Sequence, residues 1–159
     1  MTLLADILTL PVPYIAYVQG QPVGAICCRK EAWDRDRKTG RRAYIMTLGV
    51  LPDYRRLGIG NLLYKMPVLY SQLFRLFDTL VGSLLLERIL SNLSSSPAHQ
   101  DLDWVCLHVQ SANIAAHSFY ESHGFRVLEW VEGYYERNLG VVPPDAFLLG
   151  LNLQRSRQV

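Results

Sequence analysis

The stretch that decides the fold is Tyr44 to Gly60, which reads YIMTLGVLPDYRRLGIG. It begins with the apolar run Tyr44 to Val50, which is typical of a β-strand. Pro52 and Asp53 break this strand, a basic loop with two glycines follows from Arg55 to Gly60, and an apolar, helix-like run comes next. Glycines let the backbone approach an anion closely, and the amides and dipole at the start of a helix attract it. The stretch therefore predicts a strand, a phosphate-binding loop and a helix.

The residues around the two glycines exclude two common phosphate loops. A P-loop nucleoside triphosphatase needs a Lys-Ser/Thr pair where Asn61 and Leu62 stand. The dinucleotide fingerprint needs three glycines at another spacing. What remains is Arg-x-x-Gly-x-Gly after a strand, and the residues alone also permit an ordinary strand-to-helix turn with two solvated arginines.

Composition indicates one domain over residues 1–159, because half of the residues are hydrophobic and can form a core. The net charge of +2 is too small to argue for nucleic-acid binding. Cys27, Cys28 and Cys106 match neither a disulfide framework nor a metal-binding spacing, which favours a reducing compartment. The first residues lack the basic region of a signal peptide, and charges interrupt the longest apolar region, so we expect neither a leader nor a membrane span.

The order of patterns predicts a mixed sheet in a layered α/β domain, because strands come before and after the helices. We expect helices over 1–10, 83–93 and 113–122, and strands over 15–18, 23–28, 44–50, 104–109, 125–131 and 146–153. The strands over 15–18 and 23–28 should form a hairpin. The charged segment 29–42 is interpreted as a solvated hairpin tip, and 94–103 as a polar linker.

Motifs in the second half sharpen this interpretation. Leu107-His108-Val109-Gln110 and the FYxxxGF segment from Phe119 to Phe125 follow the Arg-x-x-Gly-x-Gly loop in order. Together with YIMTLG and the block Tyr134 to Arg137, they resemble the GNAT-superfamily N-alpha-acetyltransferases of the NatE type. The resemblance implies the GNAT acyl-CoA N-acyltransferase fold, with a central, mixed but mostly antiparallel sheet flanked by helices. It also implies acetyl transfer from acetyl-CoA to the α-amino group of a protein N-terminus. The first residue of that substrate should be Met and the second a hydrophobic residue.

The resemblance assigns catalytic roles to three side chains. Tyr44 and His108 should hold a water that takes the proton of the attacking amine, whose pKa is about 8. A histidine suits this role because its pKa lies near the working pH. Tyr120 is a candidate to protonate the leaving thiolate. Outside this motif context, His108 would be interpreted as a core histidine, and the two tyrosines as packing aromatics.

The resemblance also implies two binding surfaces. Backbone amides of Leu48 and Val50 should bind the pantetheine and polarise the thioester carbonyl. The remaining acetyl-CoA contacts are expected from Arg55, Arg56, Gly58, Gly60, Asn113 and Tyr120. The slot for the peptide N-terminus is expected from Pro11, Val12, Tyr14, Met46, Tyr134 and Tyr135. No metal site is expected, because the other histidines are not spaced to form a ligand set with His108.

Two departures from the family leave other functions open. The relatives carry a helix before the first hairpin that forms one wall of the slot, and here Tyr14 runs almost directly into the hairpin. Residues 61–82 interrupt the loop and helix as an atypical insertion, interpreted as a retained intron or a mispredicted gene model; a lack of splice signals near its ends in the coding DNA would contradict this. The alternatives to N-terminal acetylation are a lysine or small-amine acetyltransferase and a catalytically impaired structural subunit of the GNAT fold. Relatives of this type dock on a helical-repeat auxiliary subunit at the ribosome, in the cytoplasm and also the nucleus, and do not read nucleic acid directly.

Overall fold

The computed structural model describes residues 13–35, 38–55 and 80–156. The helix expected over 1–10, the predicted site residues Pro11, Val12, Arg56, Gly58 and Gly60, and most of the 61–82 insertion lie outside the described residues.

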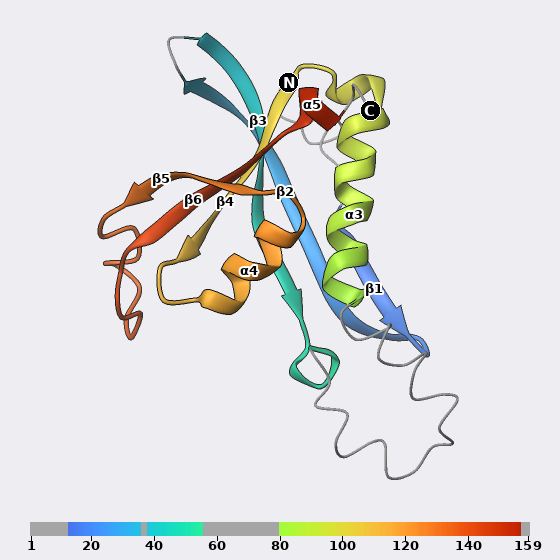
Figure 1. The fold of residues 1–159 in the computed structure, drawn as a ribbon. Helices are drawn as coiled ribbons and strands as arrows, with labels where there is room; N and C mark the ends of the chain where they lie inside the picture. The colour runs from blue at the N-terminus through green and yellow to red at the C-terminus, as the bar shows by residue number, and fades with distance from the viewer. Residues whose placement is uncertain (1–12, 36–37, 56–79, 157–159) are drawn as a thin grey trace, which may run out of the picture. The chain divides into compact units, whose positions relative to one another are not determined.

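Six strands form one sheet in the order β1-β2-β3-β4-β6-β5 (Figure 1). The strands are β1 (Tyr14–Val18), β2 (Gln21–Arg35), β3 (Lys38–Val50), β4 (Leu102–Gln110), β5 (Arg126–Val131) and β6 (Ala146–Asn152). β3 and β4 are parallel, with Arg41 opposite Leu102 and Tyr44 opposite Cys106. The pairs β1–β2, β4–β6 and β5–β6 are antiparallel. The expected mixed, mostly antiparallel sheet is therefore confirmed.

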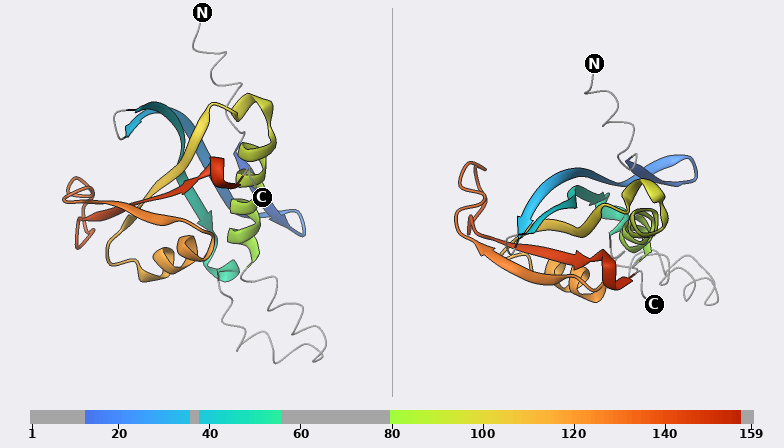
Figure 2. Two further views of the ribbon diagram at one scale, coloured as in Figure 1. Left: turned by 45° about the horizontal axis from the view of Figure 1, so that its top comes forward. Right: turned by 90° about the horizontal axis from the view of Figure 1, so that it is seen from above.

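The chain divides into two compact units, and β2 and β3 contribute residues to both. The first unit comprises residues 1–28 and 46–96 and contains the β1–β2 hairpin, a short 3-10 turn η1 (Pro52–Tyr54) and helix α3 (Leu80–Ser95). α3 lies beside β1 (Figure 2). The helix buries one face, because its apolar residues recur at helical spacing, and this face consists of Leu85, Leu86, Ile89 and Leu93.

Gly24 of β2 allows this helix to pack closely in the first unit. A Cβ at this position would lie 3.0 Å from the carbonyl oxygen of Gly49 and 3.2 and 3.3 Å from side-chain atoms of Val81 and Leu85. Any larger residue would therefore push against the backbone of β3 and against α3 together.

The second unit comprises residues 29–45 and 97–159 and contains most of the sheet. Helix α4 (Ile114–Ser122) packs on β6 through His117, whose ring meets Phe147 edge-on at 4.9 Å between centroids. The turn η3 (Pro97–His99) precedes β4, and the short helix α5 (Leu153–Ser156) contacts β4. The buried core of the second unit is apolar and includes Ala43, Leu102, Val105, Cys106, Leu107, Phe125 and Leu149.

The interpretation of segment 29–42 as a solvated tip is wrong, because β2 continues to Arg35 and β3 already begins at Lys38. The charges pair with one another, which lets the strands continue. Arg42 Nη2 lies 2.5 Å from Glu31 Oε1, and the two side chains are only 14% and 22% exposed. On the same segments, Lys30 and Arg41 both bind Asp101. The predicted polar linker is also shorter than expected, since α3 runs to Ser95.

Candidate active site

The second unit brings Tyr44, His108 and Tyr134 into one cluster. Ala43 and Ile45 are buried, so the alternation of side chains along β3 turns Tyr44 to the other face of the strand. The Tyr44 hydroxyl lies 2.8 Å from His108 Nδ1, which belongs to the neighbouring strand β4. The Tyr134 hydroxyl lies 3.0 Å from the same Tyr44 oxygen. The ring of Tyr134 stacks on the His108 imidazole, with centroids 3.9 Å apart and planes 14° apart.

Tyr134 is held by a turn after β5. Gly133 begins this turn at a φ of +63°, a conformation that side-chain-bearing residues rarely adopt. The Gly133 amide donates to Asp145 Oδ1 at 2.8 Å, and the Tyr135 amide donates to the Pro144 carbonyl oxygen at 2.7 Å. The Tyr135 ring meets that of Tyr134 edge-on at 4.8 Å. Tyr134 and Tyr135, two of the three tyrosines predicted for the peptide slot, therefore lie at the Tyr44–His108 pair.

Burial keeps the cluster uncharged. Desolvation and, after it, the positive charge of Arg42 lower the pKa of His108 to about 4, and the carboxylate of Glu31 opposes both. Burial, followed by the hydrogen bond with Tyr134, raises the pKa of Tyr44. The expectation of a histidine pKa near the working pH is thus wrong for this chain, because the sequence does not reveal how far the ring is desolvated. At neutral pH both groups are neutral.

Arg42 and Glu31 belong to this site, although neither was predicted as a site residue. The Arg42 guanidinium carbon lies 5.4 Å from the centre of the Tyr44 ring. The signal that points to it is its position two residues before Tyr44, because residues i and i+2 of a strand share a face. The charges of segment 29–42 indicate a loop, and the alternation of side chains along a strand is not expected in a loop.

Tyr120 and Asn113 take structural positions in the second unit. The Tyr120 side chain is 7% exposed and packs edge-on against Phe119 and Phe125, and burial raises its pKa to about 12. Asn113 caps α4, because its side-chain oxygen accepts a hydrogen bond from the Ala116 amide at 3.1 Å. The packing of Tyr120 matches the alternative interpretation of this residue, whereas the cap formed by Asn113 was not predicted, although Asn is a preferred residue immediately before a helix.

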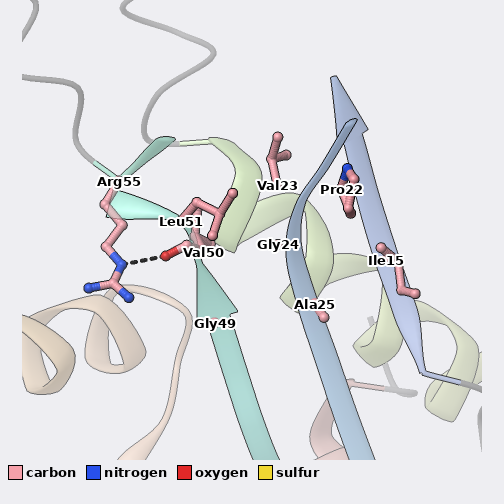
Figure 3. Close-up of a pocket in the computed structure, with 9 residues that line it drawn as sticks. All are labelled: Ile15, Pro22, Val23, Gly24, Ala25, Gly49, Val50, Leu51 and Arg55. Carbon is pink, nitrogen blue, oxygen red and sulfur yellow. Dashed lines mark hydrogen bonds between the residues drawn. The ribbon is translucent and has the colours of Figure 1, made fainter. Parts of the chain in front are cut away.

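The first unit contains a pocket of about 420 Å3 with a mainly apolar lining (Figure 3). Two of the residues predicted to bind acetyl-CoA, Val50 and Arg55, line it, and the Arg55 Nε donates to the Val50 carbonyl oxygen. Its other walls are Ile15, Pro22, Val23, Gly24, Ala25, Gly49 and Leu51. Leu48 and Met46 of β3 are not among the lining residues, and Met46 is 48% exposed.

Tyr14 of β1, predicted for the peptide slot, also belongs to the first unit and carries the guanidinium of Arg88 at 6.0 Å from its ring centre. Among the described site residues, the second unit brings together Tyr44, His108, Tyr134 and Tyr135, and the pocket of the first unit brings together Val50 and Arg55.

Over 13–35, 38–55 and 80–156, no group of three or more His, Cys, Asp or Glu side chains is placed to hold a metal ion. Within the same ranges, no helix has the length and apolar character that crossing a membrane requires.

Comparisons with known proteins agree with this fold. Residues 5–66 match the family described as Acetyltransferase (GNAT) family. The chain is 32% identical over 142 residues to "Probable N-acetyltransferase san" of Drosophila melanogaster, covering 89% of this chain and 60% of that protein. It is 32% identical over 140 residues to "N-alpha-acetyltransferase 50" of Danio rerio, covering 88% of this chain and 64% of that protein. The chain therefore spans less than two thirds of the length of these curated relatives.

A solved structure gives the same result, and the match covers a larger share of that protein. The chain is similar, at 30% identity and a TM-score of 0.58, to "Arabidopsis thaliana Naa50 in complex with bisubstrate analogue CoA-Ac-MVNAL". The match covers 87% of this chain and 71% of that one. The fold and the motifs thus define an α/β protein with a mixed central sheet, and the chain belongs to the GNAT acetyltransferase family. The three relatives named here are N-acetyltransferases, two of them of the type numbered 50.

Proposed function

We propose that this chain transfers the acetyl group of acetyl-CoA to the α-amino group of protein N-termini that begin with Met and a hydrophobic residue. The observation that carries the proposal is the neutral Tyr44–His108 pair covered by the stacked ring of Tyr134. The peptide part of the analogue named with the Arabidopsis structure, MVNAL, begins with Met and Val, which supports the proposed substrate class.

In the proposed reaction the amine nitrogen attacks the thioester carbonyl carbon. The nitrogen–carbon bond forms, the carbon–sulfur bond breaks, and the electron pair leaves with the sulfur of CoA. The amine proton passes through a water that Tyr44 and His108 hold, and the imidazole of His108 accepts it. A neutral imidazole with a pKa of about 4 is a weak base, yet it suffices once attack has begun, because the nitrogen becomes much more acidic as it bonds to the acyl carbon.

Tyr120 has a narrower role in this scheme than proton transfer. A thiol has a pKa of about 8.5, so a thiolate is a weaker base than the anion of a tyrosine whose pKa is about 12. Giving the proton of Tyr120 to the departing sulfur is therefore uphill by roughly three units, and we infer that this tyrosine donates a hydrogen bond and keeps its proton.

Acetyl-CoA binding is proposed for the loop after β3 and for the amides of Leu48 and Val50. Arg55, Arg56, Gly58 and Gly60 would hold the pyrophosphate, and Asn113 would lie near the CoA arm. Arg55 supports this scheme through its position at the pocket of the first unit. The match to the family ends at residue 66, inside the proposed 61–82 insertion. We also propose that the chain binds a helical-repeat auxiliary subunit at the ribosome, and that it acts in the cytoplasm.

The test is turnover of acetyl-CoA with a short peptide that begins Met-Leu, measured for the parent chain, for His108→Ala and for a variant that lacks residues 61–82. We expect activity in the parent and its loss in His108→Ala. Activity in the deletion variant alone would show that the insertion blocks the site while the assignment holds. Silence in both folded chains, or preference for an internal lysine over the free N-terminus, would refute the proposed function.

A further inference from the structure

The guanidinium of Arg42 is enclosed on several sides by the second unit. Its carbon lies 4.8 Å from the centre of the Trp33 ring and 5.4 Å from the centre of the Tyr44 ring. Its Nε donates to Glu31 Oε1 at 2.6 Å, its Nη2 lies 2.5 Å from the same oxygen, and its side chain is 14% exposed. A planar guanidinium suits such a place, because it stacks on aromatic rings and holds a carboxylate through fixed, parallel N–H groups.

Glu31 connects this group to a second cation at the same tyrosine. Its other oxygen, Oε2, accepts from Arg29 Nε at 3.0 Å, and the Arg29 guanidinium carbon lies 5.3 Å from the centre of the Tyr44 ring. One carboxylate therefore links two guanidinium groups that both contact the face of Tyr44. A phenol ring held in this way cannot swing freely about its side-chain bonds, so its hydroxyl keeps one direction.

We propose that Arg42, held by Glu31, is a positioning residue that fixes the Tyr44 ring so that its hydroxyl stays on His108 Nδ1. Arg42 and Tyr44 share one face of β3, so the arginine acts on the hydroxyl through the ring and has no contact with the reacting atoms assigned to it. The catalytic meaning of this arrangement rests on the proposed function, whereas the arrangement of the side chains does not.

The charges of the pair also act on the imidazole. Arg42 lowers the pKa of His108 and Glu31 raises it. The other charged or titratable groups around the pair are Arg29 from β2, and Tyr134 and Tyr135 from the turn after β5; β6 places Leu148 opposite His108 in the ladder. Because Arg42 and Glu31 carry opposite charges, their removal should move the histidine in opposite directions.

The test compares Arg42→Gln, Arg42→Lys and Glu31→Gln with Arg41→Gln as a matched control. Arg41 precedes Arg42 in the chain, is 59% exposed and pairs with Asp101. Titration by NMR, with the His108 signal assigned through His108→Gln, should show a higher histidine pKa in Arg42→Gln, a lower one in Glu31→Gln and no change in the control. These shifts are measured without substrate, so they do not depend on the proposed activity.

Arg42→Lys separates position from charge. Lysine keeps the positive charge but loses the planar stack and the parallel donors, so we expect the His108 pKa to stay low while the NOE between the Tyr44 and His108 rings weakens. In the active enzyme, kcat should fall about 10- to 100-fold with KM for acetyl-CoA unchanged, because a small misplacement of a catalytic group has effects of this size. Denaturant midpoints identify any variant that fails to fold. Arg42→Lys is the conservative replacement, because it keeps the positive charge of the side chain.

An unchanged ring NOE in Arg42→Lys, or an unchanged His108 pKa in Arg42→Gln, would overturn the proposal even in an active enzyme. The expected NMR changes in a chain that acetylates no peptide would support the positioning role and refute the proposed function. The two failures are therefore distinguishable.

Discussion

The replacement Tyr44→Phe removes one oxygen atom from the centre of the site and keeps the ring between its neighbours. That oxygen makes two hydrogen bonds, at 2.8 Å to His108 and at 3.0 Å to Tyr134. Each such bond stabilises a protein by about 0.5–1.5 kcal/mol, so we expect the free energy of unfolding to fall by roughly 1–3 kcal/mol. Loss of a group that relays a proton costs about 100- to 10,000-fold in turnover, and kcat should fall within that range.

The assay is acetyl-CoA turnover on the Met-Leu peptide at saturating substrates, with denaturant unfolding of the same samples. Tyr17→Phe is the matched control, because Tyr17 is 61% exposed on β1 and is not among the proposed site residues. It should change neither quantity. A Tyr44→Phe enzyme that is folded and turns over within about threefold of the parent would refute the proton route, since the loss expected for such a group is at least 100-fold.

Three further predictions concern stability and are measured by denaturant unfolding. The pKa of His108 is about 4 in the fold and 6.5 when unperturbed, so the stability that the neutral ring contributes is complete above pH 6.5 and is lost as the pH falls through 4. After allowance for partial solvation, the parent should lose about 2 kcal/mol more of its free energy of unfolding over this window than His108→Gln does. Parallel pH profiles of the two proteins would contradict the burial argument. Asn113→Ala removes the hydrogen bond to the Ala116 amide and should cost about 1 kcal/mol; an unchanged midpoint would show that the cap contributes nothing. Gly24→Ala should cost about 1–3 kcal/mol because its methyl group meets packed atoms, whereas Gly49→Ala finds nothing within 4 Å and should be nearly neutral; equal effects would refute the close-packing explanation.

Local patterns predicted much of the fold because they depend on neighbours in the chain. Alternating apolar residues before Pro52 identified the end of β3, and the two strand-like runs 15–18 and 23–28 identified the first hairpin. Helix α4 was predicted to within one residue, since Asn113 begins the pattern and is its N-cap. These elements need little information from distant parts of the chain.

The charged strands could not be predicted in the same way, because their stability depends on partners that are distant in the sequence. Lys30 and Arg41 find Asp101, and Glu31 finds Arg42, so polar side chains that indicate a loop are paired in a sheet. Only the register of the strands reveals these pairs. The missed role of Arg42 follows directly from this misassigned loop.

The site shows the same division. Tyr44 and His108 lie 64 residues apart in the chain, and no periodicity predicts their contact; the family resemblance selected them, and the parallel β3–β4 pair brings them together. The pKa of His108 depends on burial and on Arg42, and that of Tyr44 on burial and on Tyr134, and a sequence does not show these surroundings. The roles proposed for Leu48, Val50, Arg55 and Asn113 toward acetyl-CoA stay predictions.

The most direct measurement of the central claim is the position of the acetyl group in the product. A peptide that begins Met-Leu and carries one internal lysine is incubated with acetyl-CoA and the chain, and fragment-ion mass spectrometry locates the added mass. The account predicts acetylation on the α-amine of Met, dependent on His108 and absent when that amine is blocked beforehand. Acetylation on the lysine side chain, or acetylation of Met that persists in His108→Ala, would contradict it.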